Sequence, residues 1–163
     1  MKIRTAVPED LEQIFKIYET AREYMRRSGN PNQWKDSHPA PELLVNDVHL
    51  QRLYLVIDES NDNLLGSFAC IEGKDPTYSY IERGSWLNDL PYLTLHRVAS
   101  AGTQKGILNY ILQWTSARTS DIRIDTHEDN HTMQHILEKN GFQKCGIIYL
   151  ANGEPRLAYH RHI

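Results

Sequence analysis

The segment from Tyr92 to Ile107 carries the clearest chemical signal, because a run of β-forming residues leads through Ala-Gly-Thr-Gln-Lys-Gly into a helical pattern. Free backbone N–H groups at the start of a helix carry partial positive charge and bind anions. Gly102 and Gly106 let a phosphate approach these groups closely, and Lys105 adds a cation. The segment therefore predicts a phosphate-binding loop. Two glycines in such a loop are equally compatible with turn geometry alone.

Two histidines near this loop are candidates for acid–base chemistry. A group that takes a proton from an ammonium works best with a pKa near the operating pH, and histidine fits that range. Strand alternation predicts that His96 shares a face with Val98. His127 ends the next strand, where it can orient His96 or hold an amine. The alternatives are a hydrogen-bonded structural role for His96 and a helix-capping role for His127. No fixed ligand spacing links His96, Asp125 and His127, so no metal is expected.

Hydrophobic periodicity predicts the elements that must position these residues. Apolar residues at three- and four-residue steps indicate helices, and short β-rich runs indicate strands. The order is β-α-α-β-β-β-α-β-α-β-β, which predicts an α/β fold with a mixed sheet covered by helices. The expected strands are 2–5, 53–57, 64–72, 92–99, 122–126, 142–150 and 156–160, and the expected helices are 8–27, 41–51, 103–118 and 129–140.

Two connections bear on function and assembly. The segment 73–90 is polar, broken by proline and glycine, and long enough to indicate a functional surface loop. Asn152-Gly153 predicts a two-residue hairpin turn between the last two strands. The strand 156–160 would then form an exposed edge that can pair with another copy, which makes a homodimer plausible.

Composition limits the class of protein. A length of 163 residues suits a single domain covering 1–163. The net charge of −3 is spread without a like-charged block, which argues against a nucleic-acid partner. No apolar run approaches the length that spans a bilayer and no signal peptide is visible, so a cytoplasmic protein without a membrane partner is expected. Cys70 and Cys145 lie in apolar, strand-like runs, which favours reduced core thiols.

The order of elements, the glycine loop and the segment from Asn130 to Phe142, Asn-His-Thr-Met-Gln-His-Ile-Leu-Glu-Lys-Asn-Gly-Phe, together resemble the GNAT acetyltransferase superfamily. The likeness covers nearly the whole chain. It implies that acetyl-CoA enters between strands 92–99 and 122–126, which splay apart in that fold. It also implies that the pantetheine pairs with backbone groups near Val98 and Ser100 and that Asn130 contacts the cofactor. The pyrophosphate would lie on the loop and helix start, at Gly102, Lys105, Gly106 and Ile107.

Two positions depart from the family pattern. The loop of the family usually ends in glycine or alanine, whereas the equivalent position here is Leu108 and the loop looks shortened. A leucine there can crowd the phosphate, or the shorter loop can turn it into the core. Leu137 stands where the family often carries a tyrosine that protonates the departing thiolate. Another group or water must then supply that proton, or transfer is slow or absent.

The resemblance implies an acceptor site opposite the CoA, lined by the first two helices, their connection and the closing hairpin. The candidates are Gln33, Trp34 and Tyr149, with Trp34 also suited to anchoring its loop in the core. The leading hypothesis is an N-acetyltransferase that moves an acetyl group from acetyl-CoA to a small-molecule primary amine. Some members of the resembled family place a histidine on the strand of His96 as the general base. The alternatives are a weakly catalytic acyl-CoA sensor and an α/β scaffold without CoA affinity.

Overall fold

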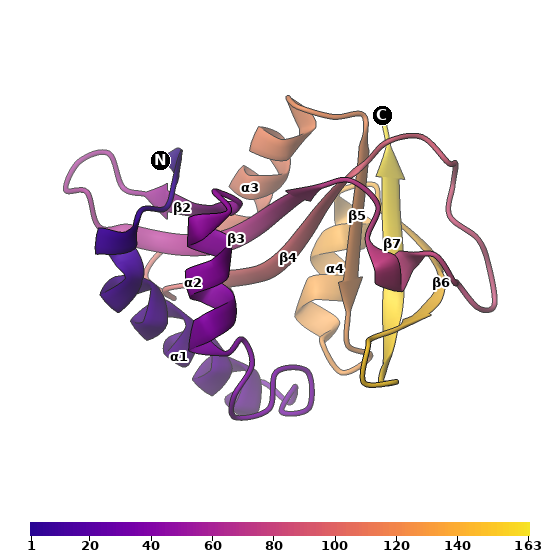
Figure 1. Cartoon of the computed structure of the whole chain (residues 1–163), viewed down its shortest axis with the longest axis horizontal. Helices are drawn as coiled ribbons and strands as arrows, with labels where there is room; N and C mark the ends of the chain where they lie inside the picture. Colours follow the sequence, from indigo (N-terminus) through magenta and orange to yellow (C-terminus); the bar gives the residue numbers. More distant parts are fainter.

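The computed structural model describes all 163 residues, and its centre is a seven-stranded mixed sheet in the order β1-β2-β3-β4-β5-β7-β6 (Figure 1). All neighbouring strands are antiparallel except β4 and β5, which run parallel. The order of elements and the fold class predicted from the sequence are confirmed. The strands are β1 (Lys2–Thr5), β2 (Leu53–Ile57), β3 (Leu64–Glu72), β4 (Leu93–Ser100), β5 (Asp121–Thr126), β6 (Gln143–Tyr149) and β7 (Pro155–His162).

Helices cover both faces of the sheet. Figure 1 shows α1 and α2 in front of the sheet and α3 and α4 behind it. None of the helices has the length and apolar character needed to cross a membrane. The α-helices are α1 (Leu11–Arg27), α2 (Pro41–His49), α3 (Ile107–Ser116) and α4 (His131–Lys139), and two single-turn 3-10 helices are η1 (Pro8–Asp10) and η2 (Pro76–Tyr78).

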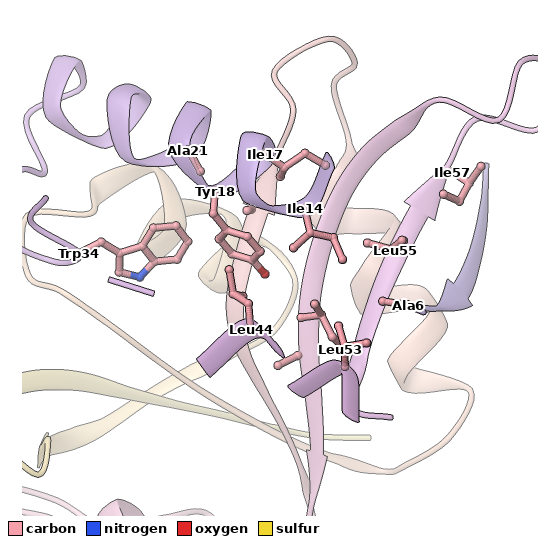
Figure 2. Close-up of a cluster of buried hydrophobic side chains, with 13 residues drawn as sticks. Ala6, Ile14, Ile17, Tyr18, Ala21, Trp34, Leu44, Leu53, Leu55 and Ile57 are labelled. Carbon is pink, nitrogen blue, oxygen red and sulfur yellow. The ribbon is translucent and has the colours of Figure 1, made fainter. Parts of the chain in front are cut away.

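A separate hydrophobic core lies on each face. The apolar stripe of α1 supplies Ile14, Tyr18 and Ala21 to the front core, where Figure 2 shows them above β2 residues such as Leu53 and Leu55. The other core joins α3 and α4 to the opposite face of the sheet. Because both faces are covered, the strands that carry the site are held from both sides.

The parallel strands β4 and β5 separate almost as soon as they begin. They pair only through Leu93 with Ile122 and Thr94 with Arg123, although β4 continues to Ser100 and β5 to Thr126. Figure 1 shows the resulting wedge between the two strands, with α4 behind it. Along this wedge β4 has no strand partner on its β5 side. The splayed pair expected from the sequence resemblance is therefore present.

A β-bulge in β4 changes which way its side chains face. Ala69 of β3 pairs with His96 and Ser67 pairs with Ala99, so Arg97 and Val98 together oppose one residue of β3. Arg97 has φ 53°, in the left-handed region. Since a bulge interrupts strand alternation, Val98 packs into the α3–α4 core while Ala99 packs into the α1–α2 core. The prediction that His96 and Val98 share a face was wrong.

Three further expectations need correction. Helix α3 begins at Ile107 rather than at residue 103, because residues 101–106 form a loop. The final hairpin has a five-residue connection, 150–154, since Tyr149 pairs with Pro155. Strand β7 is flanked by β5 and β6, so it is not an edge, and the edge strands are β1 and β6. Glu82 forms a β-bridge with Ile147 and so covers part of the β6 edge.

Candidate active site

The bulge in β4 is held by both front helices. The Tyr18 hydroxyl of α1 donates a hydrogen bond of 2.6 Å to the carbonyl of Arg97. Asp47 of α2 has no exposed surface and accepts from Arg97 Nε at 2.8 Å and Nη2 at 3.1 Å. The same carboxylate accepts from Arg52 Nε at 2.7 Å. These hydrogen bonds to the carbonyl and the side chain of Arg97 fix the backbone of β4 in the region where it runs apart from β5.

His96 lies beside this separation and is bound to a carboxylate. Its Nε2 is 2.7 Å from Asp75 Oδ2, and its Nδ1 is 3.8 Å from Asp125 Oδ2. Although burial alone would raise the pKa of Asp75, hydrogen bonds from His96 and Thr77 lower it to about 2. An ionised carboxylate only accepts, so Nε2 carries the proton and Nδ1 of the neutral ring holds the lone pair. The free nitrogen therefore faces Asp125.

Tyr78 completes this group from η2. Its hydroxyl donates to Asp125 Oδ2 at 2.7 Å, and its ring lies 6.1 Å from that of His96. Burial raises the pKa of Tyr78 well above its usual value, and the charge of Asp125 adds to the effect. The hydroxyl therefore stays protonated and keeps Asp125 in place. No group of three or more His, Cys, Asp or Glu side chains is arranged to hold a metal ion.

The long connection 73–91 brings Asp75 and Tyr78 to the sheet, and a buried cation anchors it. The Arg123 guanidinium of β5 lies between the rings of Trp86 and Tyr92, 4.2 and 4.0 Å from their centroids, and Nη2 donates to the carbonyl of Asn88 at 2.9 Å. Cation–π contacts of this kind strengthen when they are shielded from water. The loop that the sequence marks as functional thus supplies the partner of His96.

The loop between β4 and α3 leaves the start of α3 open. Gly102 and Gly106 have φ of 79° and 82°, a region that favours glycine. Gly106 is the N-cap of α3 and no side chain caps the helix, so the first N–H groups of α3 are available to an anion. Ser100 Oγ accepts from the N–H of Gly102 at 3.0 Å, which shapes the loop, and Lys105 is exposed beside it.

Comparison with known proteins decides the family. The family model of the GNAT acetyltransferase domain matches residues 1–143. The chain belongs to the GNAT acetyltransferase family. A solved structure of a GNAT-family acetyltransferase from Streptococcus agalactiae is 34% identical, with a TM-score of 0.89 over 99% of this chain and 95% of that one. The family uses acetyl-CoA as its co-substrate, so the chain is an acyltransferase.

More distant GNAT structures share the fold. A ribosomal-protein-alanine N-acetyltransferase from Brucella melitensis is 16% identical, with a TM-score of 0.65 and complete coverage of both chains. The NatC complex bound to Gag peptide and CoA contains a chain that is 12% identical, with a TM-score of 0.62 over 100% of this chain and 99% of that one. Among curated proteins, the sequence comparison finds no match.

Asn130, which the sequence resemblance suggests as a cofactor contact, is the N-cap of α4. Its Oδ1 accepts from the N–H of Met133 at 3.0 Å, and its Nδ2 donates to Gln33 Oε1 at 2.9 Å. His127 stabilises the turn that precedes α4, because its Nδ1 accepts a hydrogen bond from the N–H of Asp129 at 3.0 Å. The partner of His96 is thus Asp75 rather than His127.

The three acceptor candidates fall in different places. Gln33 reaches the start of α4, as described above. Trp34 is 6% exposed and packs against Tyr18 with ring centroids 5.7 Å apart, so its indole anchors the α1–α2 connection (Figure 2). Tyr149 is exposed at the end of β6, where its hydroxyl donates to Glu82.

Both departures from the GNAT pattern face the interior. Leu108 is partly buried and packs against the α3–α4 core. Leu137 has no exposed surface and belongs to the same core. Position 137, where the sequence resemblance leads us to expect a tyrosine, therefore holds a leucine of the core.

We expect that Leu137→Tyr does not restore a general acid. Leu137 is fully buried, so the larger phenol must overpack the core and lower the free energy of unfolding by about 1–3 kcal/mol. Leu137→Met, which conserves volume, is the matched control. Chemical denaturation and kcat should be measured on both. A stable tyrosine variant with a raised kcat would show that the position does open to the thiolate.

Sequence reasoning missed Asp75, Tyr78 and Asp47. Asp75 precedes Pro76 in a polar loop, and nothing in its neighbourhood indicates that it meets a strand 21 residues later. Asp47 is different, because a carboxylate at a position that a helical stripe turns inward is a detectable signal of a buried ion pair.

Proposed function

We propose that this chain is an N-acetyltransferase that moves the acetyl group of acetyl-CoA to a primary amine of a small molecule, with His96 as the general base. The observation that carries the proposal is the pair of His96 and Asp75 at the point where β4 leaves β5. A histidine whose second nitrogen is fixed by a carboxylate is set in one tautomer and one orientation.

The amine nitrogen is proposed to lie beside His96 Nδ1 and Asp125 Oδ2, within hydrogen-bond distance of both atoms. These atoms are 3.8 Å apart, too far for a hydrogen bond to each other. An ammonium can donate to both. Nδ1 then takes one proton, and the neutral amine nitrogen attacks the thioester carbonyl. The N–C bond forms, the nitrogen releases its second proton to solvent, and the C–S bond breaks. The positive charge that His96 gains lies beside two carboxylates, Asp75 and Asp125.

The departing group needs no tyrosine in this proposal. A thiolate is a competent leaving group near neutral pH, because the pKa of an ordinary thiol is about 8.5. Solvent at the open end of the wedge can protonate it. Leu137 in the core is compatible with transfer by this route.

Acetyl-CoA is proposed to bind along the unpaired side of β4. The unpaired backbone of β4 near Val98 and Ser100 suits the pantetheine, and the open start of α3 suits the pyrophosphate. Gly102, Lys105 and Ile107 line that loop. Asn130, at the opposite side of the wedge, is the remaining proposed contact.

The phosphate loop can be tested with two nearly isosteric variants at Gly106. Asparagine and aspartate both tolerate the left-handed conformation that Gly106 adopts, but only aspartate is charged. We expect Gly106→Asp to weaken acetyl-CoA binding at least tenfold by repulsion of the pyrophosphate, whereas Gly106→Asn changes it much less. Calorimetric titration with acetyl-CoA measures both. Equal affinities would place the phosphates elsewhere.

The function itself is tested by following CoA release with acetyl-CoA and a panel of primary amines. Release that requires an amine, with the acetylated amine found by mass spectrometry, is the expected result. Tight binding of acetyl-CoA without release for any amine would instead support an acyl-CoA-binding protein.

A further inference from the structure

A groove crosses the end of the sheet where β2 and β4 begin and β3 ends. Its volume is about 700 Å³, in the range of sites that hold small molecules. The connection between α2 and β2 lines it on one side, and the end of α3 with the turn that follows supplies further lining residues. Leu93, which also lines the groove, is the first residue of β4, whereas the proposed phosphate loop follows the last residue of that strand. The groove therefore shares no residue with the proposed contacts of acetyl-CoA and the amine.

Two arginines line the groove, and each has only part of its guanidinium group occupied by the chain. The Arg52 side chain is 28% exposed; its Nε donates to the buried Asp47 at 2.7 Å, while Nη1 and Nη2 form no hydrogen bond within the chain. The Arg118 guanidinium lies 3.6 Å from the centre of the Trp114 ring, and its Nη1 donates to the Trp114 carbonyl at 2.7 Å. Because these contacts already restrict both side chains, their remaining N–H groups are preorganised to bind an anion.

The charges around the groove favour an anion as well. Asp47 carries one negative charge but binds two guanidinium groups, those of Arg52 and Arg97, so this cluster keeps an excess of positive charge. Arg118 adds a second cation, and Glu72 is the one acidic residue that lines the groove. Positive charge therefore remains after all four groups nearest the groove and Arg97 are counted.

Most of the remaining lining is apolar. Six of the ten lining residues are hydrophobic. The rings of Tyr54 and Trp114 have centroids 4.8 Å apart, and both side chains are half-buried. Leu50 lies beside them and is 52% exposed. Aromatic rings pack edge to face against one another, so a flat aromatic body with one carboxylate matches both the rings and the cations.

We propose that this groove is a second ligand site, which binds a small aromatic carboxylic acid with its carboxylate on Arg52 and its ring against Tyr54 and Trp114. Arg118 supplies further positive charge at the same site. The inference is independent of the proposed function, because it uses none of the residues assigned to the transfer reaction.

The first test compares indole-3-acetate with tryptophol, which carries a hydroxyl in place of the carboxylate on the same ring. Each is titrated into ¹⁵N-labelled protein that contains excess CoA, so that the proposed acetyl-CoA site is occupied, and amide shifts are followed by NMR. We expect the acid to shift residues 50–54, 70–72 and 114–118 and to bind about tenfold more tightly than the alcohol.

Four variants locate the site. Arg52→Gln removes the cation and leaves an amide that can donate to Asp47; it should weaken the acid by about tenfold. Leu50→Glu places a negative charge in the groove and should weaken the acid by about fivefold, whereas the isosteric Leu50→Gln should change it much less. Val45→Glu, on the same helix but outside the groove and 44% exposed, is the control for charge and should leave the affinity unchanged.

The outcomes are distinct. Shifts at the groove that require the carboxylate, and that Leu50→Glu weakens but Leu50→Gln and Val45→Glu do not, support the inference. Because Leu50 is exposed, this comparison remains decisive even if Arg52→Gln fails to fold. No shift at millimolar acid, equal binding of tryptophol, shifts confined to residues around the loop 101–106, or equal effects of Leu50→Glu and Val45→Glu would each overturn it.

Discussion

Replacing His96 by alanine is expected to lower kcat by about 10²–10⁴-fold, the usual contribution of a positioned general base. The imidazole binds Asp75 through Nε2 and faces Asp125 through Nδ1. Without it the amine has no base in place. Steady-state CoA release at saturating acetyl-CoA measures the effect.

His127→Ala is the matched control for this prediction. The His127 ring accepts a hydrogen bond from Asp129 in the turn that precedes α4, away from the partners of His96, so its loss should cost some stability and little of kcat. Acetyl-CoA binding should remain in His96→Ala, since the phosphate loop is untouched. Comparable losses of kcat in both variants would contradict the assignment of His96.

Replacing Asp47 by asparagine is expected to lower the free energy of unfolding by about 3 kcal/mol. The carboxylate is fully buried and holds both Arg97 and Arg52, so its removal leaves two guanidinium groups without their counter-charge. For a chain of this length, the melting temperature should fall by roughly 6–12 °C. Because Arg97 forms the bulge, acetyl-CoA should also bind more weakly.

The Asp36→Asn variant is the control, because it removes the charge of a carboxylate that pairs with an arginine but is exposed. Asp36 also pairs with an arginine, Arg26, at 3.2 Å, but its side chain is 91% exposed. An exposed pair contributes little, so this variant should change stability by no more than about 0.5 kcal/mol. Thermal and urea unfolding of both variants provide the comparison. Equal effects would show that the burial of Asp47 is not what makes it important.

The sequence allowed the architecture to be predicted because local signals repeat along it. The apolar stripe of α1, the β-rich runs and the glycine after α4 each act over a few residues, and their order matched the GNAT fold. The glycines of the loop proposed to bind phosphate are a local signal of the same kind, since Gly102 and Gly106 lie in the short loop just before Ile107, the first residue of α3.

The site could be predicted only in part, because its geometry depends on contacts between distant segments. His96 was identified from its residue type, but its face was wrong since the bulge at Arg97 is fixed by Tyr18 and Asp47 on other elements. Asp75 reaches His96 through a loop whose path depends on Arg123, Trp86 and Tyr92. No local pattern encodes such a path.

The hairpin shows a limit of turn signals. Asn152-Gly153 does lie in the final turn, yet strand pairing stops at Tyr149 and Pro155, and the connection is longer than the dipeptide suggests. Proline cannot donate to a ladder, which favours an end of the strand at this residue. Which strand of the hairpin forms the edge depends instead on the pairing of β7 with β5, a contact between distant segments.

The most direct test of the account is transfer of a ¹³C-labelled acetyl group from acetyl-CoA to an amine nitrogen, followed by mass spectrometry in wild type and His96→Ala. The account predicts labelled N-acetyl product at a rate that His96→Ala lowers by at least about a hundredfold. Labelled product formed equally fast by both proteins would contradict it.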